Sequence, residues 1–179
     1  VNRHLHIDTT SRTTEKLRIV SRNQQLLRVD FEDAPRKEVI DRCLSDYEEL
    51  LSKVDVVAIS DYGKGSLNST EWMIQLAKAQ KIPVVVDPKG HDFSRYRGAT
   101  VVTPNELELK GVVGPWSSTA EMENKALELV RQIEIDGLLV TRGEDGMTLI
   151  RLDGGPLQEK ARSLEVYDIS GAGDTVVAM

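Results

Sequence analysis

Hydrophobic residues along the chain fall into short continuous runs that alternate with longer segments of helical periodicity. The runs have the length of β-strands and lie at residues 17–20, 26–31, 54–60, 83–87, 100–103, 137–141 and 147–152. Between them, apolar residues recur every three or four positions, which predicts helices at residues 35–53, 69–80, 105 onward and 118–134. This alternation predicts an α/β fold with a mostly parallel sheet and helices on both faces.

The ends of the predicted elements carry signals of their own. Pro35 suits the first turn of a helix, and we expect Asp33 to cap that helix. Ser118 and Glu121 have the spacing of a capping box at the start of the last predicted helix. The first two strands are separated by a polar turn at residues 21–24, which predicts a β-hairpin.

Composition narrows the class of protein. The 179 residues suffice for one domain with a hydrophobic core, and 40% hydrophobic with 29% charged residues is typical of a globular protein. A formal net charge of -6 argues against general nucleic-acid binding. No apolar run approaches the roughly 18 residues of a membrane span. Cys43 is the single cysteine, which excludes an intrachain disulfide and favours a reducing cytoplasm; we expect it to be buried on the first helix.

Polar residues follow predicted strands at their carboxyl ends, where ligands bind in sheets of this kind. The strand at residues 54–60 is a mainly apolar run of the kind that is buried on both faces, and Asp61 and Lys64 come after it. Lys89 follows the next strand. A lysine at either place could meet a phosphate group; the alternative is a solvated turn.

The segment Gly171-Ala172-Gly173-Asp174 has the composition of an anion site. Its first three residues carry almost no side chain, so their amide groups can approach a ligand closely. Asp174 would then lie beside the anion and could align and deprotonate an attacking hydroxyl, as phosphoryl transfer requires. The alternative is a glycine-rich turn in which Asp174 interacts with a helix dipole. A dinucleotide-binding loop is disfavoured because Val176 stands where its third glycine would be.

Two further segments are candidates for nucleotide chemistry. Asn105 and Glu108 are three residues apart, so on a helix they share a face and could hold a hydrated Mg²⁺. The alternative is an ordinary helix start with Asn105 as its cap. The glycines at residues 141–146 either form a hairpin or let the backbone pass under a nucleotide.

The order of these segments resembles that of a known family. The series Asp87-Pro88-Lys89, Thr103-Pro104-Asn105-x-x-Glu108, Thr141-Arg142-Gly143 and Gly171-Ala172-Gly173-Asp174 resembles the ribokinase-like (PfkB) carbohydrate kinases, with Ser170 at a position that is usually Thr. Longer stretches at residues 21–28, 60–65, 87–90, 96–100 and 165–168 resemble the heptose 7-phosphate kinase domains of bacterial heptose kinase/adenylyltransferases, which serve ADP-heptose synthesis.

The resemblance implies a reaction and roles for residues. The reaction is ATP-dependent phosphorylation of the anomeric hydroxyl of D-glycero-D-manno-heptose 7-phosphate to the 1,7-bisphosphate, for lipopolysaccharide core synthesis. Asp174 would be the catalytic base, and Gly171, Ala172 and Gly173 would form the anion hole. ATP and Mg²⁺ would contact Asn105, Glu106, Leu107, Glu108, Thr141, Gly143 and Gly146, with Asn105 and Glu108 reaching Mg²⁺ through water. Possible sugar-phosphate contacts are Arg18, Lys64 and Lys89.

The resemblance also implies an architecture. The family has a three-layer sandwich, and residues 1–32 would form part of a small β lid that pairs subunits into a homodimer. Residues 33–179 would form an incomplete ATP-binding and catalytic core. Because the first sheet region and the last helices of the family are missing, we expect a piece truncated at both ends that does not turn over alone. Two alternatives stay open: a related kinase for another sugar, and a catalytically incomplete nucleotide-binding or oligomerisation fragment.

Overall fold

The computed structural model describes residues 2–22, 24–63, 65, 67–161 and 172–178. The chain forms two compact units, one of residues 1–50 and 64–66 and the other of residues 51–63 and 67–179. The predicted division into a lid over residues 1–32 and a core from residue 33 stays a prediction. Of the helices that the structure describes, none is long and apolar enough to cross a membrane.

The first unit contains the predicted hairpin and the first helix. Strands β1 (Glu15–Ser21) and β2 (Gln24–Phe31) pair antiparallel, as predicted. Helix α1 (Lys37–Leu51) begins later than expected, so Asp33, the predicted cap, lies four positions before its first residue, and Asp33 Oδ2 accepts a hydrogen bond from Arg12 N (3.0 Å) instead. Cys43 is exposed rather than buried, although its neighbours on the helical wheel of α1, Val39 and Tyr47 among them, are half-buried.

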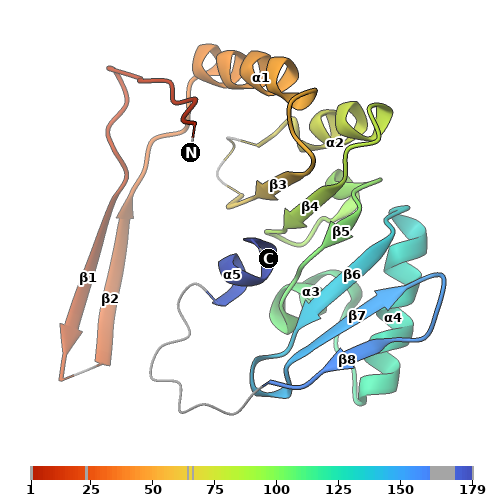
Figure 1. Ribbon diagram of the computed structural model, residues 1–179. Helices are drawn as coiled ribbons and strands as arrows, with labels where there is room; N and C mark the ends of the chain where they lie inside the picture. Colours follow the sequence, from red (N-terminus) through yellow and green to blue (C-terminus); the bar gives the residue numbers. More distant parts are fainter. Residues whose placement is uncertain (1, 23, 64, 66, 162–171, 179) are drawn as a thin grey trace. The chain divides into compact units, whose positions relative to one another are not determined.

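The second unit is built on a six-stranded sheet in the order β3-β4-β5-β6-β7-β8, which Figure 1 shows. The first four strands are parallel, namely β3 (Val57–Ser60), β4 (Val84–Asp87), β5 (Val101–Val102) and β6 (Gly137–Thr141). The last two, β7 (Met147–Arg151) and β8 (Leu157–Glu159), are antiparallel, and β8 was not predicted. The predicted α/β class with a mostly parallel sheet is confirmed.

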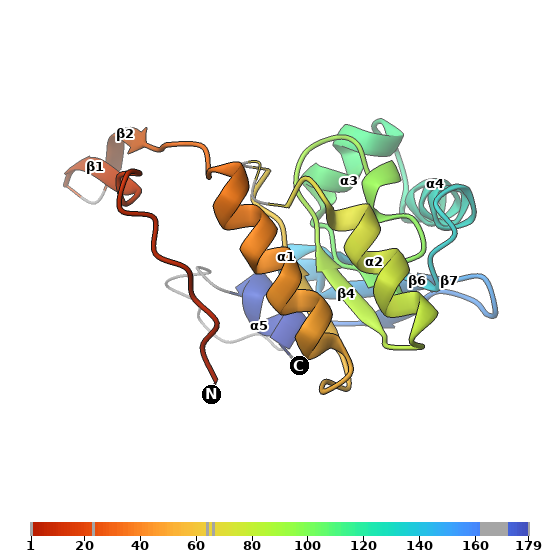
Figure 2. The same ribbon diagram turned by 90° about the horizontal axis from the view of Figure 1, so that it is seen from above.

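Helices surround this sheet. They are α2 (Thr70–Ala79), α3 (Glu106–Val113), α4 (Thr119–Gln132) and α5 (Ala172–Ala178), with short 3-10 turns η1 (Ser94–Tyr96) and η2 (Gly143–Asp145). In Figure 1, α4 lies behind β6 and β7, while α5 lies in front of the sheet next to β4. Figure 2 shows α3 and α4 side by side. Ser118 caps α4 by accepting a hydrogen bond from Glu121 N (3.2 Å), but the predicted box is only half formed, because Glu121 Oε2 accepts from Ser117 N (2.8 Å).

The two faces of the sheet are buried to different degrees. The strand register aligns one set of side chains that is fully buried, comprising Ile59, Val86, Val102, Leu138, Val140 and Ile150. The alternate set is only half-buried among the described residues, and it includes Val85, Val101, Leu139 and Leu149. The prediction that residues 54–60 are buried on both faces is therefore wrong: β3 is an edge strand, and Val56 is 52% exposed.

Candidate active site

Residues of the predicted segments follow the carboxyl ends of the four parallel strands and therefore lie next to one another in a row. Asp61 follows β3, Lys89 follows β4, and Asn105 follows β5 next to the end of β6. Backbone contacts tie neighbouring members together: Asp61 N donates to Asp87 O (3.0 Å), and Asn105 forms a parallel bridge with Thr141. The parallel sheet thus places residues that are up to 80 positions apart (61 to 141) along the same edge.

Asn105 and Glu108 form a reciprocal capping box at the start of α3. Asn105 Oδ1 accepts a hydrogen bond from Glu108 N (2.9 Å), and Glu108 Oε2 accepts one from Asn105 N (3.0 Å). Lys89 Nζ donates to the other carboxylate oxygen of Glu108 (2.7 Å), and this bond raises the pKa of Lys89. The helix-cap alternative is therefore what the structure shows, and it leaves the Glu108 side chain oriented and 13% exposed.

Asn105 and Glu108 are the residues that would hold the Mg²⁺ implied by the family resemblance. Among the described residues, no group of three His, Cys, Asp or Glu side chains could hold a metal directly. Asn105 and Glu108 nevertheless supply an amide and a carboxylate oxygen on one helix turn, which are the hard donors that Mg²⁺ takes. These donors fit a cation held through water, and the Mg²⁺ contact itself stays a prediction.

The segment from Thr141 to Gly146 forms the tight connection between β6 and β7. Arg142 Nε donates to Glu106 Oε1 (3.1 Å), which fastens this connection to the first turn of α3. Leu107, in the same turn of α3, is 79% exposed. Gly143 has φ 57° and Gly146 has φ 86°, so both adopt backbone conformations that favour glycine. The segment is thus a hairpin connection that also borders the row of site residues.

A pair of glycine substitutions tests how this connection is held. Gly143→Ala is expected to lower the free energy of unfolding by about 1–2 kcal/mol, which is the usual cost of placing an L-amino acid in the left-handed backbone conformation. Gly146→Ala should cost clearly more, because an added Cβ would collide with the backbone oxygen of Glu159 in β8. Urea unfolding of the two variants measures the difference; equal losses would show that β8 does not approach Gly146 this closely.

Two of the predicted site residues, Lys64 and Gly171, lie outside the described residues. Ala172, Gly173 and Asp174 belong to the first turn of α5, and only their backbone is described. That helix lies against β4, the strand that precedes Lys89. The anion hole and the catalytic base remain predictions.

Arg18, a predicted substrate contact, lies in the hairpin of the first unit. Its cross-strand partner is Arg28, so two guanidinium groups occupy opposite positions on one face. Arg28 is paired with Asp30 (2.6 Å), whereas the described residues provide no ion pair to Arg18. Asp30 offsets the charge of Arg28, and the role of Arg18 as a substrate contact stays a prediction.

Sequence reasoning missed the side chains that hold the loops after β3 and β4. Tyr96 is fully buried, and its hydroxyl contacts both Asp61 and the backbone of Lys89. Arg95 contacts the same carboxylate of Asp61 (3.4 Å). Tyr96 is the first residue of a family-like stretch at residues 96–100, but neither it nor Arg95 carries a site motif.

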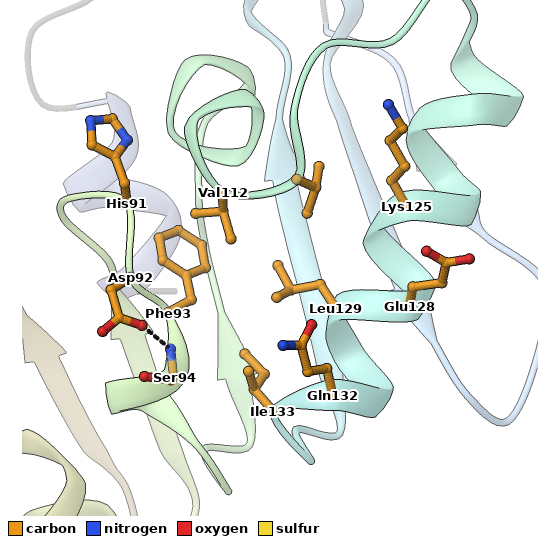
Figure 3. Close-up of a pocket in the computed structure, with 11 residues that line it drawn as sticks. His91, Asp92, Phe93, Ser94, Val112, Lys125, Glu128, Leu129, Gln132 and Ile133 are labelled. Atoms are coloured by element: carbon orange, nitrogen blue, oxygen red, sulfur yellow. Dashed lines mark hydrogen bonds between the residues drawn. The ribbon is translucent and has the colours of Figure 1, made fainter.

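A cavity of about 400 Å³ lies elsewhere in the second unit, between the loop after β4, the end of α3 and α4. Figure 3 shows His91 on one side of it and Leu129 and Gln132 of α4 on the other. None of the predicted site residues lines it. The row at the strand ends, rather than this cavity, carries the candidate chemistry.

Comparison with known proteins agrees with the geometry. Residues 1–179 match the pfkB family carbohydrate kinases. The bifunctional protein HldE of Aeromonas hydrophila is 52% identical over 166 residues, which cover 93% of this chain and 35% of that protein. The HldE of Pasteurella multocida is 48% identical over 170 residues, covering 95% of this chain and 36% of that protein. The chain thus spans about a third of the length of these relatives.

Solved structures support the same fold. A ribokinase from Giardia lamblia superposes with a TM-score of 0.75 at 19% identity. The superposition covers 95% of this chain and 55% of the ribokinase chain. Arabidopsis thaliana ribokinase, solved with ribose and ATP, gives a TM-score of 0.64 at 23% identity, covering 74% of this chain and 44% of that chain. Since the family match extends from the first residue to the last, the chain belongs to the pfkB family of carbohydrate kinases.

Proposed function

We propose that this protein transfers a phosphoryl group from ATP to the anomeric hydroxyl of D-glycero-D-manno-heptose 7-phosphate in the bacterial cytoplasm, for lipopolysaccharide core synthesis. The observation that carries the proposal is the row of family segments at the carboxyl ends of β3 to β6. Identity of about half to the HldE proteins favours the heptose over other sugars.

Phosphoryl transfer depends on positioning and on stabilising negative charge, and the row supplies both. Lys89 presents an ammonium group whose pKa is raised by Glu108, so it stays charged. Asn105 and Glu108 would hold Mg²⁺ through water, and Mg²⁺ when bound neutralises charge on the phosphates. ATP would lie along the first turn of α3, which contains Glu106 and Leu107. It would also contact the connection between β6 and β7, which contains Thr141, Gly143 and Gly146.

The residues proposed to bind and activate the sugar phosphate belong mainly to the segment at the start of α5 and to the hairpin. Asp174 would take the proton of the anomeric hydroxyl, and Gly171, Ala172 and Gly173 would bind the moving phosphoryl group. Lys64, Lys89 and Arg18 would contact phosphate. These assignments follow the family resemblance.

The hairpin also supports a homodimer. Leu17, Ile19 and Leu27 lie on one of its faces and are 52%, 44% and 50% exposed. A two-stranded hairpin is only marginally stable in water, and an apolar face of this kind gains stability when a partner covers it. We include pairing of two copies through this face in the proposed function.

The function is tested with a protein of the full length of the relatives, incubated with Mg·ATP and a panel of sugars and sugar phosphates. Phosphorylation of heptose 7-phosphate at the anomeric position, followed by ³¹P NMR, is the expected result. Activity on a different sugar only would make this a related kinase, and no activity on any would favour a nucleotide-binding or oligomerisation role. The 179-residue chain alone should not turn over.

Glu108→Gln tests the proposed Mg²⁺ contact. The glutamine oxygen can still accept from Asn105 N, so the cap survives while the charge is lost. We expect the Mg²⁺ concentration for half-maximal rate to rise by about 10–100-fold. Glu121→Gln is the matched control, since Glu121 has the same third position in α4 and binds Ser117 N there. Equal shifts in both variants would contradict the assignment.

A further inference from the structure

A single buried oxygen connects the loops that follow β3 and β4. Tyr96, at the end of η1, has 0% exposure, and its hydroxyl donates to Asp61 Oδ2 (2.8 Å). The same oxygen accepts a hydrogen bond from Lys89 N (3.0 Å) and lies 3.2 Å from Lys89 O. The ring packs edge-on against Phe93, with centroids 5.5 Å apart, so the hydroxyl is held in place. Tyr96 thus contacts both loops at once.

Asp61 extends this contact along the loop after β3. Its side chain is buried, with 3% exposure of the residue, and its Oδ1 accepts a hydrogen bond from Gly63 N (2.8 Å). Arg95 approaches Asp61 Oδ2 (3.4 Å) and donates to Leu67 O (2.7 Å). The loop is therefore fastened near its beginning by Asp61 and near its end by Arg95.

Lys89 extends the contact toward α3. The backbone of Lys89 is held by Tyr96, and its ammonium is held by Glu108, which also caps α3 with Asn105. Two sets of hydrogen bonds, joined by the covalent side chain of Lys89, thus connect Asp61 and Tyr96 to Glu108. Because the backbone of Lys89 is fixed at one end of its side chain, the position of its ammonium depends on the Tyr96 hydroxyl.

The protonation state of Tyr96 suits this role. Burial raises the pKa of Tyr96, because a phenolate would lose its hydration, and the hydrogen bond to Asp61 raises it further despite the opposing Lys89 amide. The hydroxyl therefore keeps its proton and donates a hydrogen bond to Asp61 Oδ2. A phenylalanine would leave Asp61 buried without this donor, and such loss of one partner is the costly case.

We propose that Tyr96 is a positioning residue for the phosphoryl transfer: its hydroxyl sets the loops after β3 and β4, and with them Lys89, in the place where the phosphate groups bind. Arg95 supports it by holding Asp61 and Leu67. The inference rests on the proposed function for the reaction itself, whereas the arrangement of the loops can be tested independently of any substrate.

The kinetic test uses Tyr96→Phe in the full-length protein. We expect kcat/KM for the sugar phosphate to fall by about 10²-fold, as for a reacting group misplaced by roughly 1 Å. KM for ATP or the sugar phosphate should rise as well, which a mere loss of folded protein would not produce. The matched control is Thr148→Val, which also removes a fully buried hydroxyl but one without a partner among the described residues. Its kinetic constants should stay within about twofold.

The structural test is amide hydrogen exchange of the same variants. Tyr96→Phe should speed exchange at Lys89 N, which loses its acceptor, and at Gly63 N, while Thr148→Val should change neither. Unchanged exchange, or faster exchange with unchanged kcat and KM, would overturn the inference. Absence of sugar kinase activity in the unmodified protein would refute the proposed function instead, and exchange would still decide whether Tyr96 holds the loops.

A second variant covers the case in which Tyr96→Phe does not fold. Arg95→Met removes the contacts to Asp61 and Leu67 from a side chain that is 29% exposed, so the core is spared. We expect the same change of KM and a smaller loss, about 10-fold in kcat/KM. Wild-type constants for Arg95→Met would count against the inference.

Discussion

Replacing Asp174 by Asn in the full-length protein is expected to lower kcat for sugar phosphorylation by about 10²–10⁴-fold, the contribution of a positioned general base. Asparagine has the shape of aspartate but cannot take up the proton of the attacking hydroxyl. Binding of ATP should change little, because the proposed nucleotide contacts lie on α3 and on the connection after β6. Single-turnover kinetics together with ATP titration separate the two effects.

The control for this prediction is Asp136→Asn. Asp136 is exposed and precedes β6, so it lies at the amino end of that strand, away from the row of site residues. Its replacement should leave kcat unchanged. A rate near the original value in Asp174→Asn would show that another group accepts the proton and that the base assignment is wrong.

Leu138→Ala is expected to lower the free energy of unfolding of the 179-residue chain by about 2–5 kcal/mol. Leu138 has 0% exposure and lies on the fully buried face of the sheet. Leu139→Ala, one position along β6, removes the same atoms from the half-buried face and should cost clearly less. Urea unfolding of both variants measures the difference.

This pair tests the asymmetry of the sheet. If Leu139→Ala were as costly as Leu138→Ala, both faces would be covered to the same extent. The comparison is sensitive because the two residues share a strand, a residue type and a backbone environment. The cost of removing a leucine then reports mainly how completely its surroundings are packed.

Much of the fold follows from local patterns. The six predicted runs from residue 17 to residue 141 and the helices between them are present, because turn residues and hydrophobic periodicity act over a few neighbours. The caps at Asn105 and Ser118 are local in the same way, since each joins positions three residues apart. These features required no knowledge of the rest of the molecule.

The predictions from sequence are wrong where the structure of a segment depends on contacts with a neighbouring element. Strand β3 is shorter than its apolar run because its partner β4 begins only at Val84, and Val57 N is paired with Pro83 O (2.9 Å). Strand β8 has no apolar run and forms by pairing with β7. Cys43 follows the periodicity of α1 and is nevertheless exposed, because periodicity marks a face of the helix but not which neighbours cover it.

The sequence by itself determined the fold class, the strand–helix order and the segments that carry the candidate chemistry, because each of these depends on residues close together in the chain. Only the tertiary structure decided how the segments are joined. Lys89 meets Glu108 across 19 positions and Tyr96 meets Asp61 across 35, and both contacts exist because parallel strands bring their carboxyl ends to one edge. No local pattern encodes such contacts, since the distance between two loops is set by the packing of the strands that lead to them.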